Sequence, residues 1–187
     1  MKKPKINISN IIFLLVIVLL IVPQTRQPIQ IFLHKGLALF GPSIVEESKR
    51  KILTDYNWQL INDSGEIFDF NQAKGEVIVI NFWATWCPPC IAEMPSLESL
   101  YNSYHKDVVF LFVSNEKPEV ISNFITKNKY SFQFHSPKSK NPKSFEISSI
   151  PRTFIIDKKG GIVVDKTGAA NWDSNNIRKQ LDVLLKE

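Results

Sequence analysis

The stretch of sequence that decides the fold is Val77-Ile78-Val79-Ile80-Asn81-Phe82-Trp83-Ala84-Thr85-Trp86-Cys87-Pro88-Pro89-Cys90. Residues 77–83 are almost continuously apolar and rich in β-branched side chains, a pattern typical of a strand buried on both faces. Residues 87–105 then follow a helical pattern. The cysteine pair therefore falls where a central strand passes into a helix.

Cys87 and Cys90 are the only two cysteines of the chain. At the start of a helix, unpaired N–H groups and the helix dipole stabilise a thiolate, which is the attacking species in disulfide exchange. A disulfide across a two-residue spacer closes too short a loop to stabilise a fold appreciably. A zinc site would need two more ligands, and His34, His105 and His135 are not spaced to supply them. The spacing therefore indicates redox chemistry and no metal site.

The positive charge of the chain belongs to its N-terminal part. The net charge is +5, but residues 1–51 hold 8 Lys/Arg against 2 Asp/Glu, whereas residues 52–187 hold 15 against 16. A nearly neutral domain offers no basic face to DNA or RNA. We therefore predict one globular domain over residues 52–187 and no nucleic-acid partner.

The N-terminus has the pattern of a membrane-targeting segment. Lys2, Lys3 and Lys5 precede an unbroken apolar run over residues 11–22. Counted from Ile6, with the polar residues 7, 9 and 10 at the headgroup level, the segment has 17 residues, the low end of the length that spans a bilayer. No small-x-small cleavage motif follows, which favours an uncleaved signal-anchor over a cleaved signal peptide. By the positive-inside rule, we expect a cytoplasmic basic tail over residues 1–10, a membrane-spanning core over residues 11–22 and the domain outside the cytoplasm.

A linker over residues 23–51 joins this anchor to the domain. Within it, one arc of a helical wheel is apolar and the opposite arc is polar. Three interpretations fit this pattern: a helix lying on the bilayer surface, a linker helix packed on the domain, and a stalk. The apolar arc consists of Ile29, Phe32, Leu33, Leu37, Leu39 and Phe40, and the polar arc contains Gln30, His34 and Lys35.

The rest of the chain predicts alternating strands and helices. A hairpin is expected over residues 58–70 and a second over residues 153–167, and the helix over residues 87–105 is expected to kink at Pro95. The remaining expected elements are strands at 108–113 and 132–134 and helices at 118–129 and 175–185.

The motif and its flanks resemble the TlpA/ResA family of membrane-tethered thioredoxin-like proteins. The resemblance rests on residues 81–90, on Glu93-Met94-Pro95 and on Ser149-Ile150-Pro151 before Thr153-Phe154, and it extends from Trp58 to the C-terminus. It implies an α/β thioredoxin-like fold, with a mixed central sheet flanked by helices.

The resemblance also implies an activity. The expected protein is an extracytoplasmic thiol-disulfide oxidoreductase of a bacterial cytoplasmic membrane, with its redox domain on the periplasmic side. It would reduce protein disulfides without a cofactor and would be recharged by a membrane electron-donor protein of the thiol-transfer type. Cytochrome c maturation, cell-envelope thiol repair and general disulfide reduction all remain open as its role.

The roles of individual residues follow from the same resemblance. Cys87 would be the exposed nucleophile that forms a mixed disulfide with the substrate, and Cys90 would be the resolving thiol; together they would form a redox-active disulfide. A cis-proline is expected beside the pair, where backbone can bind a substrate strand. Substrate binding is thus expected at Trp86, Pro88, Ile150 and Pro151.

Two positions bear on proton transfer. Asn81 stands where ordinary thioredoxins carry a buried acid, and Glu93 lies one turn after Cys90. If Glu93 is partly buried, its pKa is raised and it takes the proton from Cys90; the alternative is a solvent-exposed helix glutamate. Arg152 replaces the threonine common after the proline, and it either adds positive charge near the thiolate or points to water.

Two other functions are compatible with this fold. A peroxidase of the peroxiredoxin type has a proline seven residues before its attacking cysteine and a threonine or serine three before it, but Ile80 and Ala84 stand there. A non-enzymatic membrane-tethered binding or chaperone module would use the substrate groove and would not need Cys87.

Overall fold

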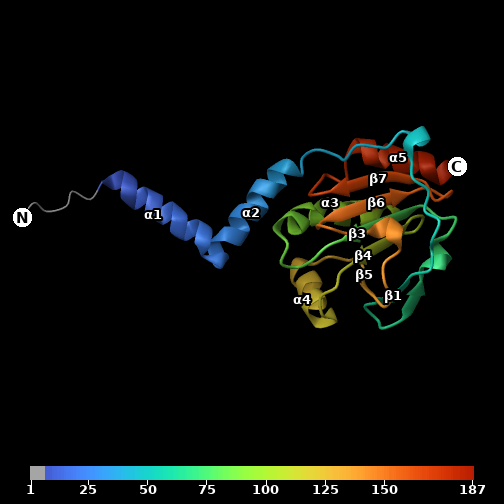
Figure 1. Cartoon of the computed structure of the whole chain (residues 1–187), viewed down its shortest axis with the longest axis horizontal. Coiled ribbons are helices and arrows are strands. Elements are labelled where there is room, and N and C mark those ends of the chain that lie inside the picture. The colour runs from blue at the N-terminus through green and yellow to red at the C-terminus, as the bar shows by residue number, and fades with distance from the viewer. Residues whose placement is uncertain (1–6) are drawn as a thin grey trace, which may run out of the picture.

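The computed structural model describes residues 7–187 of the chain. Two helices, α1 (Ile8–Ile21) and α2 (Pro23–Leu37), form a bent arm that projects from one side of an α/β domain (Figure 1). The N-terminal end of this arm is the part of the described chain farthest from the domain. The C-terminal helix α5 (Asn175–Lys186) lies on the opposite side of the molecule.

The domain is built on one mixed sheet of seven strands in the order β2-β1-β5-β4-β3-β6-β7. The central strands β3, β4 and β5 are parallel, whereas the strands on either side of them pair antiparallel. The mixed sheet that the resemblance implied is thus present. The strand bounds are β1 (Gln59–Asn62), β2 (Ile67–Asp69), β3 (Ile78–Phe82), β4 (Val109–Val113), β5 (Phe134–Pro137), β6 (Arg152–Ile156) and β7 (Ile162–Thr167).

Strand β3 is buried on both faces and separates two hydrophobic cores. Val77 and Val79 point toward the core formed with helices α3 (Pro88–Tyr104), α4 (Pro118–Asn128) and α5. Ile78 and Ile80 point toward the second core, which contains Trp58, Phe70 and Phe145. Each fully buried isoleucine contributes roughly 1.5–3 kcal/mol, so both faces of β3 hold it in place.

Short 3-10 helices cover the second core or lead into it: η1 (Glu47–Lys49), η2 (Phe70–Ala73) and η3 (Lys143–Phe145).

The segment after α2 is hydrogen-bonded to the domain. The carbonyl oxygen of Phe40 accepts a hydrogen bond from the N–H of Asn171 (2.9 Å), and the N–H of Val45 donates to the carbonyl oxygen of Val163 (2.8 Å). Pro42 is buried, and α2 packs against α3. These contacts fix the C-terminal end of α2 beside the helix that carries the cysteine pair.

The sequence patterns located most elements to within two residues. The expected hairpins are present as β1–β2 and β6–β7, and the helix that contains Pro95 runs over Pro88–Tyr104. The strand expected at 132–134 begins at Phe134, because Phe134 is the first residue to pair with β4, through Phe112. Phe132 is buried but lies before the strand.

The linker is helical from Pro23 to Leu37. Gln30 and His34 on its polar side are half-buried and face Trp86, Pro88 and Pro89 across a hollow. Two apolar side chains of the helix, Phe32 and Leu33, and two just after it, Leu39 and Phe40, are exposed instead.

The predicted membrane-spanning anchor is not confirmed. Over residues 7–187, no single helix combines the length and apolar character needed to cross a bilayer, and Ile8–Leu19 with Gln24–Gly36 meets the test only as a pair bent by 85°. The basic residues Lys2, Lys3 and Lys5 lie outside the described residues.

Candidate active site

The cysteine pair lies at the start of α3, as the sequence predicts. Cys87 is the N-cap residue of α3, and its Sγ accepts a hydrogen bond from the N–H of Cys90 (3.3 Å). The two residues form a disulfide, with their Cα atoms 5.2 Å apart. When the bond is reduced, the N–H group and the dipole of α3 favour the thiolate form of Cys87.

A groove of about 770 Å³ lies beside the pair. Cys87 and Pro88 line it, with the exposed side chain of Trp86 (64% exposed) at its rim. The opposite wall comes from the end of β4 and from residues 147–150. The groove thus brings the predicted substrate-binding residues Trp86, Pro88 and Ile150 together around the first cysteine.

Cys87 is not exposed, and the prediction of an exposed nucleophile is wrong for the disulfide form. Only 3% of Cys87 is accessible, and Cys90 is fully buried. The two cysteines still differ, because Cys87 lines the groove whereas the N–H of Cys90 points to the Cys87 sulfur. A substrate can therefore approach Cys87 through the groove.

The predicted cis-proline is present, because the Ile150–Pro151 peptide bond is cis. Pro151 is buried and immediately precedes β6, which pairs antiparallel with β3. Ile150 is half-buried and lines the groove. Strand β6 therefore delivers the proline segment to the end of the sheet where the cysteine motif begins.

Asn81 and Glu93 form a buried polar network on the helix-facing side of β3. Because side chains alternate along a strand, Asn81 shares the helix-facing side of β3 with Val77 and Val79. Its Nδ2 donates to Glu93 Oε1 (2.9 Å) and to Thr153 Oγ1 (2.7 Å). Asn81 and Thr153 are register partners on β3 and β6. The polar residue inside the core is thus matched by polar groups on α3 and β6.

The second oxygen of Glu93 is also fully engaged. Oε2 accepts from the indole N–H of Trp172 (2.9 Å) and from the backbone N–H of Ala170 (3.2 Å). Glu93 is completely buried, so the alternative of a solvent-exposed helix glutamate is wrong. One carboxyl group therefore links α3 to β3 and to the segment before α5.

Burial raises the pKa of Glu93 from its ordinary value of 4.5 to about 8. The hydrogen bonds from Trp172, Asn81 and Ala170 lower the pKa, as the positive charge of Lys166 does, but the loss of hydration outweighs them. A pKa near 8 lets the carboxyl group gain or lose a proton close to neutral pH. This is the behaviour expected of a group that manages the Cys90 proton.

Arg152 does neither of the two things expected of it. Its guanidinium forms a two-pronged ion pair with Asp165 (2.9 and 3.0 Å) and donates to the carbonyl oxygen of Glu146 (2.6 Å). The pairing with Asp165 raises the pKa of Arg152 further. The guanidinium of Arg152 is thus paired with β7 and with the loop before β6, and not with the cysteine pair.

Glu116 is a feature of the site that the sequence analysis missed. Its carboxylate accepts hydrogen bonds from the backbone N–H (2.6 Å) and the hydroxyl (2.7 Å) of Thr85, two residues before Cys87. Glu116 follows β4, the parallel neighbour of β3, so its place at the same end of the sheet could have been inferred. It holds the loop that leads into the cysteine motif.

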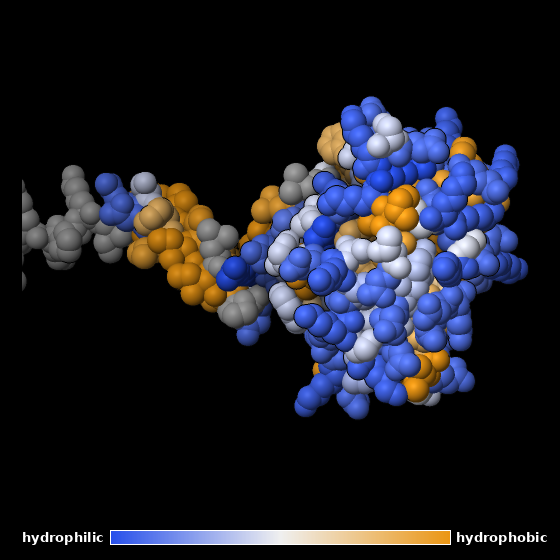
Figure 2. Space-filling view, turned by 45° about the vertical axis from the view of Figure 1, so that its right-hand side comes forward, coloured by the Kyte–Doolittle hydropathy of each residue, from blue (hydrophilic) through white to orange (hydrophobic). Residues whose placement is uncertain are grey.

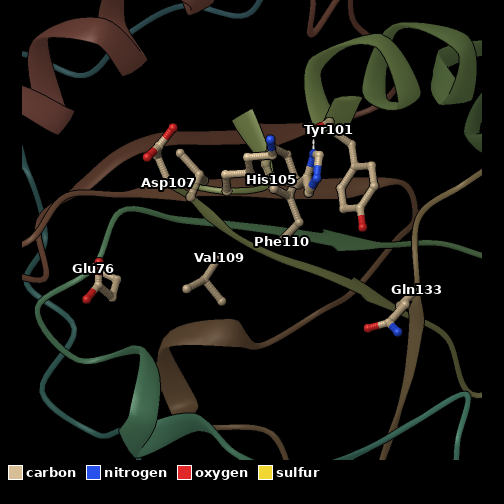
Figure 3. A pocket seen from close by; sticks show the side chains of 9 residues that line it. Glu76, Tyr101, His105, Asp107, Val109, Phe110 and Gln133 are labelled. Atoms are coloured by element: carbon tan, nitrogen blue, oxygen red, sulfur yellow. Dashed lines mark hydrogen bonds between the residues drawn. The ribbon is translucent and has the colours of Figure 1, made fainter. Parts of the chain in front are cut away.

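Another hollow, of about 460 Å³, lies near the C-terminal end of α3 (Figure 3). Tyr101 of α3 and His105, the C-cap residue after it, project into the hollow, and Phe110 and Gln133 come from β4 and the segment before β5. Among the described residues, none of those predicted for catalysis or substrate binding lines this hollow. It is therefore not part of the candidate active site.

Comparison with known proteins agrees with this geometry. A family model described as Redoxin matches residues 47–181, so the chain belongs to the redoxin family. The sporulation thiol-disulfide oxidoreductase A of Bacillus subtilis is 34% identical over 101 residues, which cover 51% of this chain and 61% of the relative. The thiol-disulfide oxidoreductase ResA of Bacillus thuringiensis is 27% identical over 158 residues, covering 81% of this chain and 87% of the relative.

A solved structure extends the comparison to the fold. The crystal structure of a candidate thiol-disulfide oxidoreductase from Bacteroides vulgatus superposes with a TM-score of 0.56 at 32% identity, over 67% of this chain and 90% of that one. These likenesses confirm the thioredoxin-like fold, the resemblance to the TlpA/ResA proteins and the predicted enzyme class, a thiol-disulfide oxidoreductase. The roles of the individual site residues stay predictions.

The raised pKa of Glu93 predicts how stability depends on pH. Because the folded pKa (about 8) exceeds the ordinary value (4.5), the folded protein binds the extra proton between these values. Stability is then fully present below pH 4.5 and falls as pH rises to about 8, by at most about 1.4 kcal/mol per pH unit. Urea unfolding of the full chain in detergent micelles at several pH values measures this slope.

Two variants isolate the contribution of Glu93. Glu93→Gln removes the titration and should flatten the slope across this range. Glu119→Gln, at an exposed position in the first turn of α4, is the matched control and should leave the slope unchanged. Equal slopes in the wild type and in Glu93→Gln would contradict the assigned pKa.

The two thiols are predicted to differ in reactivity after reduction. Cys87 should be alkylated by iodoacetamide well below the ordinary thiol pKa of about 8.5, because it lines the groove and receives an N–H group. Cys90 should react far more slowly because it is buried. Mass spectrometry of the reduced full chain over time gives both rates, and equal rates would contradict the assignment of roles.

Proposed function

We propose that this protein is a membrane-anchored reductase of protein disulfides, acting outside the cytoplasm. The observation that carries the proposal is the Cys87–Cys90 pair at the start of α3, because Cys87 lines a groove whose opposite wall includes Ile150, the residue before the cis-proline Pro151. Its membership of the redoxin family and the names of its relatives support thiol-disulfide exchange as the reaction.

The first step is attack by Cys87. In the reduced protein, the Cys87 thiolate attacks one sulfur of a substrate disulfide that lies in the groove. The substrate S–S bond breaks, a mixed disulfide forms, and the released substrate thiolate takes up a proton. Trp86, Pro88, Ile150 and Pro151 would hold the substrate chain so that its disulfide meets Cys87.

The second step is resolution by Cys90. Loss of its proton produces a thiolate that attacks Cys87 Sγ, re-forms the Cys87–Cys90 disulfide and releases the second substrate thiolate, which is protonated. The protein loses two electrons and two protons, and the substrate gains them. A membrane electron-donor protein of the thiol-transfer type would reduce the pair again.

Glu93 is proposed to accept the Cys90 proton during resolution. It lies one turn beyond Cys90 on α3, and residues three apart share one face of a helix. With a pKa of about 8, about nine in ten Glu93 carboxyl groups are protonated at pH 7 and cannot act as a base. The fraction that can accept a proton therefore rises as pH rises through 8.

The anchor and the location are part of the proposal. The described part of α1 is apolar, and many of its side chains are exposed, among them Phe13, Leu14 and Leu15. In Figure 2 this apolar surface runs along the arm, whereas the face of the domain in that view is mainly polar. Lipid would cover α1, and the uncovered Phe32 and Leu33 of α2 would lie at the bilayer surface.

The Glu93 step predicts a specific pH profile. In single-turnover reduction of a disulfide peptide, resolution should speed up with pH through an apparent pKa near 8 in the wild type. Glu93→Gln should slow resolution, with an upper range of about 10²–10⁴-fold for loss of a general base, and should let mixed disulfides accumulate. Stopped-flow measurement from pH 5 to 9, with acid-trapped mixed disulfide counted by mass spectrometry, tests this.

Controls separate the proposal from the two other functions. Glu119→Gln should behave as the wild type. Cys87→Ser should abolish exchange, whereas a binding or chaperone module would keep its function. Identical pH profiles for Glu93→Gln and the wild type would remove Glu93 from the mechanism, and rapid consumption of hydrogen peroxide would favour a peroxidase.

The proposed topology predicts how the protein behaves in cells. Externally added protease should cleave the domain in spheroplasts while the N-terminus stays protected. The mature chain recovered from membranes should begin at or near Met1. A mature N-terminus near Gln24, or a domain that resists the protease until the cells are lysed, would overturn this topology.

A further inference from the structure

A crevice separates α2 from the cysteine motif. Its volume is about 360 Å³. The α2 wall is polar, and the facing wall is made by Trp86, Pro88 and Pro89. The residues of the α2 wall are Arg26, Gln27, Gln30 and His34.

The crevice adjoins the groove beside Cys87. Trp86, Pro88 and Pro89 line both hollows, so these three side chains form a ridge with the groove on one side and the crevice on the other. A polypeptide that places its cystine at Cys87 and extends over this ridge arrives at α2. Glutamine amides there can bind main-chain groups of such a segment.

The charge of the crevice has one sign. Residues 23–37 contain no Asp or Glu, and Arg26 contributes a permanent positive charge. A neighbouring hollow of about 460 Å³ shares His34 and Pro89 with the crevice and adds Lys166. Arginine binds carboxylates through two parallel hydrogen bonds, so an acidic segment complements this wall.

The position of the wall is fixed by the fold. Helix α2 packs against α3, and the chain after it is tied to the domain through the hydrogen bond between Phe40 and Asn171. The polar wall is therefore held beside the cysteine motif in the free protein, and a bound segment need not order α2.

We propose that this crevice binds the client polypeptide next to its cystine and selects clients with acidic residues there. The inference rests on the proposed function, because it takes the groove to be the substrate site. Arg26 is then a specificity-determining residue. The phosphate of a lipid headgroup is the competing occupant.

The test compares two peptide substrates. Each is a disulfide-linked dimer with one cystine, and the two differ only in carrying Glu or Lys on both sides of the cysteine. The reduced full chain is held in nanodiscs of neutral phosphatidylcholine, and kcat/KM is measured for both peptides and for the neutral disulfide 2,2′-dithiodipyridine. The wild type should prefer the Glu peptide, and the preference should fall as salt is added.

Matched variants on the same helix localise the effect. Arg26→Gln should reduce the Glu-over-Lys preference about three- to tenfold. Arg26→Lys should keep part of it. Lys35→Gln removes a charge of the same sign from an exposed position of α2 and should leave the preference unchanged.

Each alternative outcome has a distinct signature. No reduction of 2,2′-dithiodipyridine by the wild type would contradict the proposed function itself. Normal reduction of it with an unchanged preference in Arg26→Gln would overturn the crevice proposal alone. So would equal losses for both peptides, or an effect of Arg26→Gln seen only as weaker association with vesicles that contain phosphatidylglycerol.

Discussion

The burial of strand β3 on both faces is the constraint on which the rest of the structure depends. Its odd-numbered side chains must meet the helices, and its even-numbered side chains must meet the second core. With both faces filled, the register of the strand is fixed, and its C-terminal end leads into the N-terminus of α3. The position of Cys87 at that junction is therefore a consequence of core packing as much as of its own sequence motif.

The same constraint explains the acid inside the domain. Asn81 occupies a helix-facing position of β3 and would leave polar atoms without partners in an apolar core. Glu93 supplies one partner, and Thr153 supplies another. Burial of a carboxyl group costs stability at high pH, where the group must become charged. This cost falls at a position one turn beyond Cys90 on α3.

The sequence predicted those helices and strands whose bounds depend on residues close together in the chain. The strand predicted at 77–83 is β3 (Ile78–Phe82), and the helix predicted at 118–129 is α4 (Pro118–Asn128), because periodicity and proline placement act over short distances. The cis bond at Pro151 could be expected only through resemblance, since nothing local to Ile150 requires it. The strand at 132–134 was displaced because pairing with β4, a long-range contact, sets its start.

Long-range packing also decided what the sequence missed at the site. Trp172 lies 79 residues beyond Glu93, in a segment without periodicity, so no pattern could place its indole beside the carboxyl group. The burial of Cys87 depends on walls from several elements rather than on its helix-start position. The contact of α2 with the motif follows from the course of residues 38–45 across the domain.

The amide of Asn81 gives the site a property that a second carboxylate could not. Its Nδ2 faces both Glu93 and Thr153, while Oδ1 is buried with no hydrogen-bond partner among residues 7–187. A half-turn of the amide exchanges the two ends, so that the oxygen accepts from a protonated Glu93 and from the Thr153 hydroxyl. The rotation would also leave the buried amide N–H groups without an acceptor among residues 7–187, so the observed orientation, with Nδ2 toward the carboxyl group, suits the ionised form of Glu93.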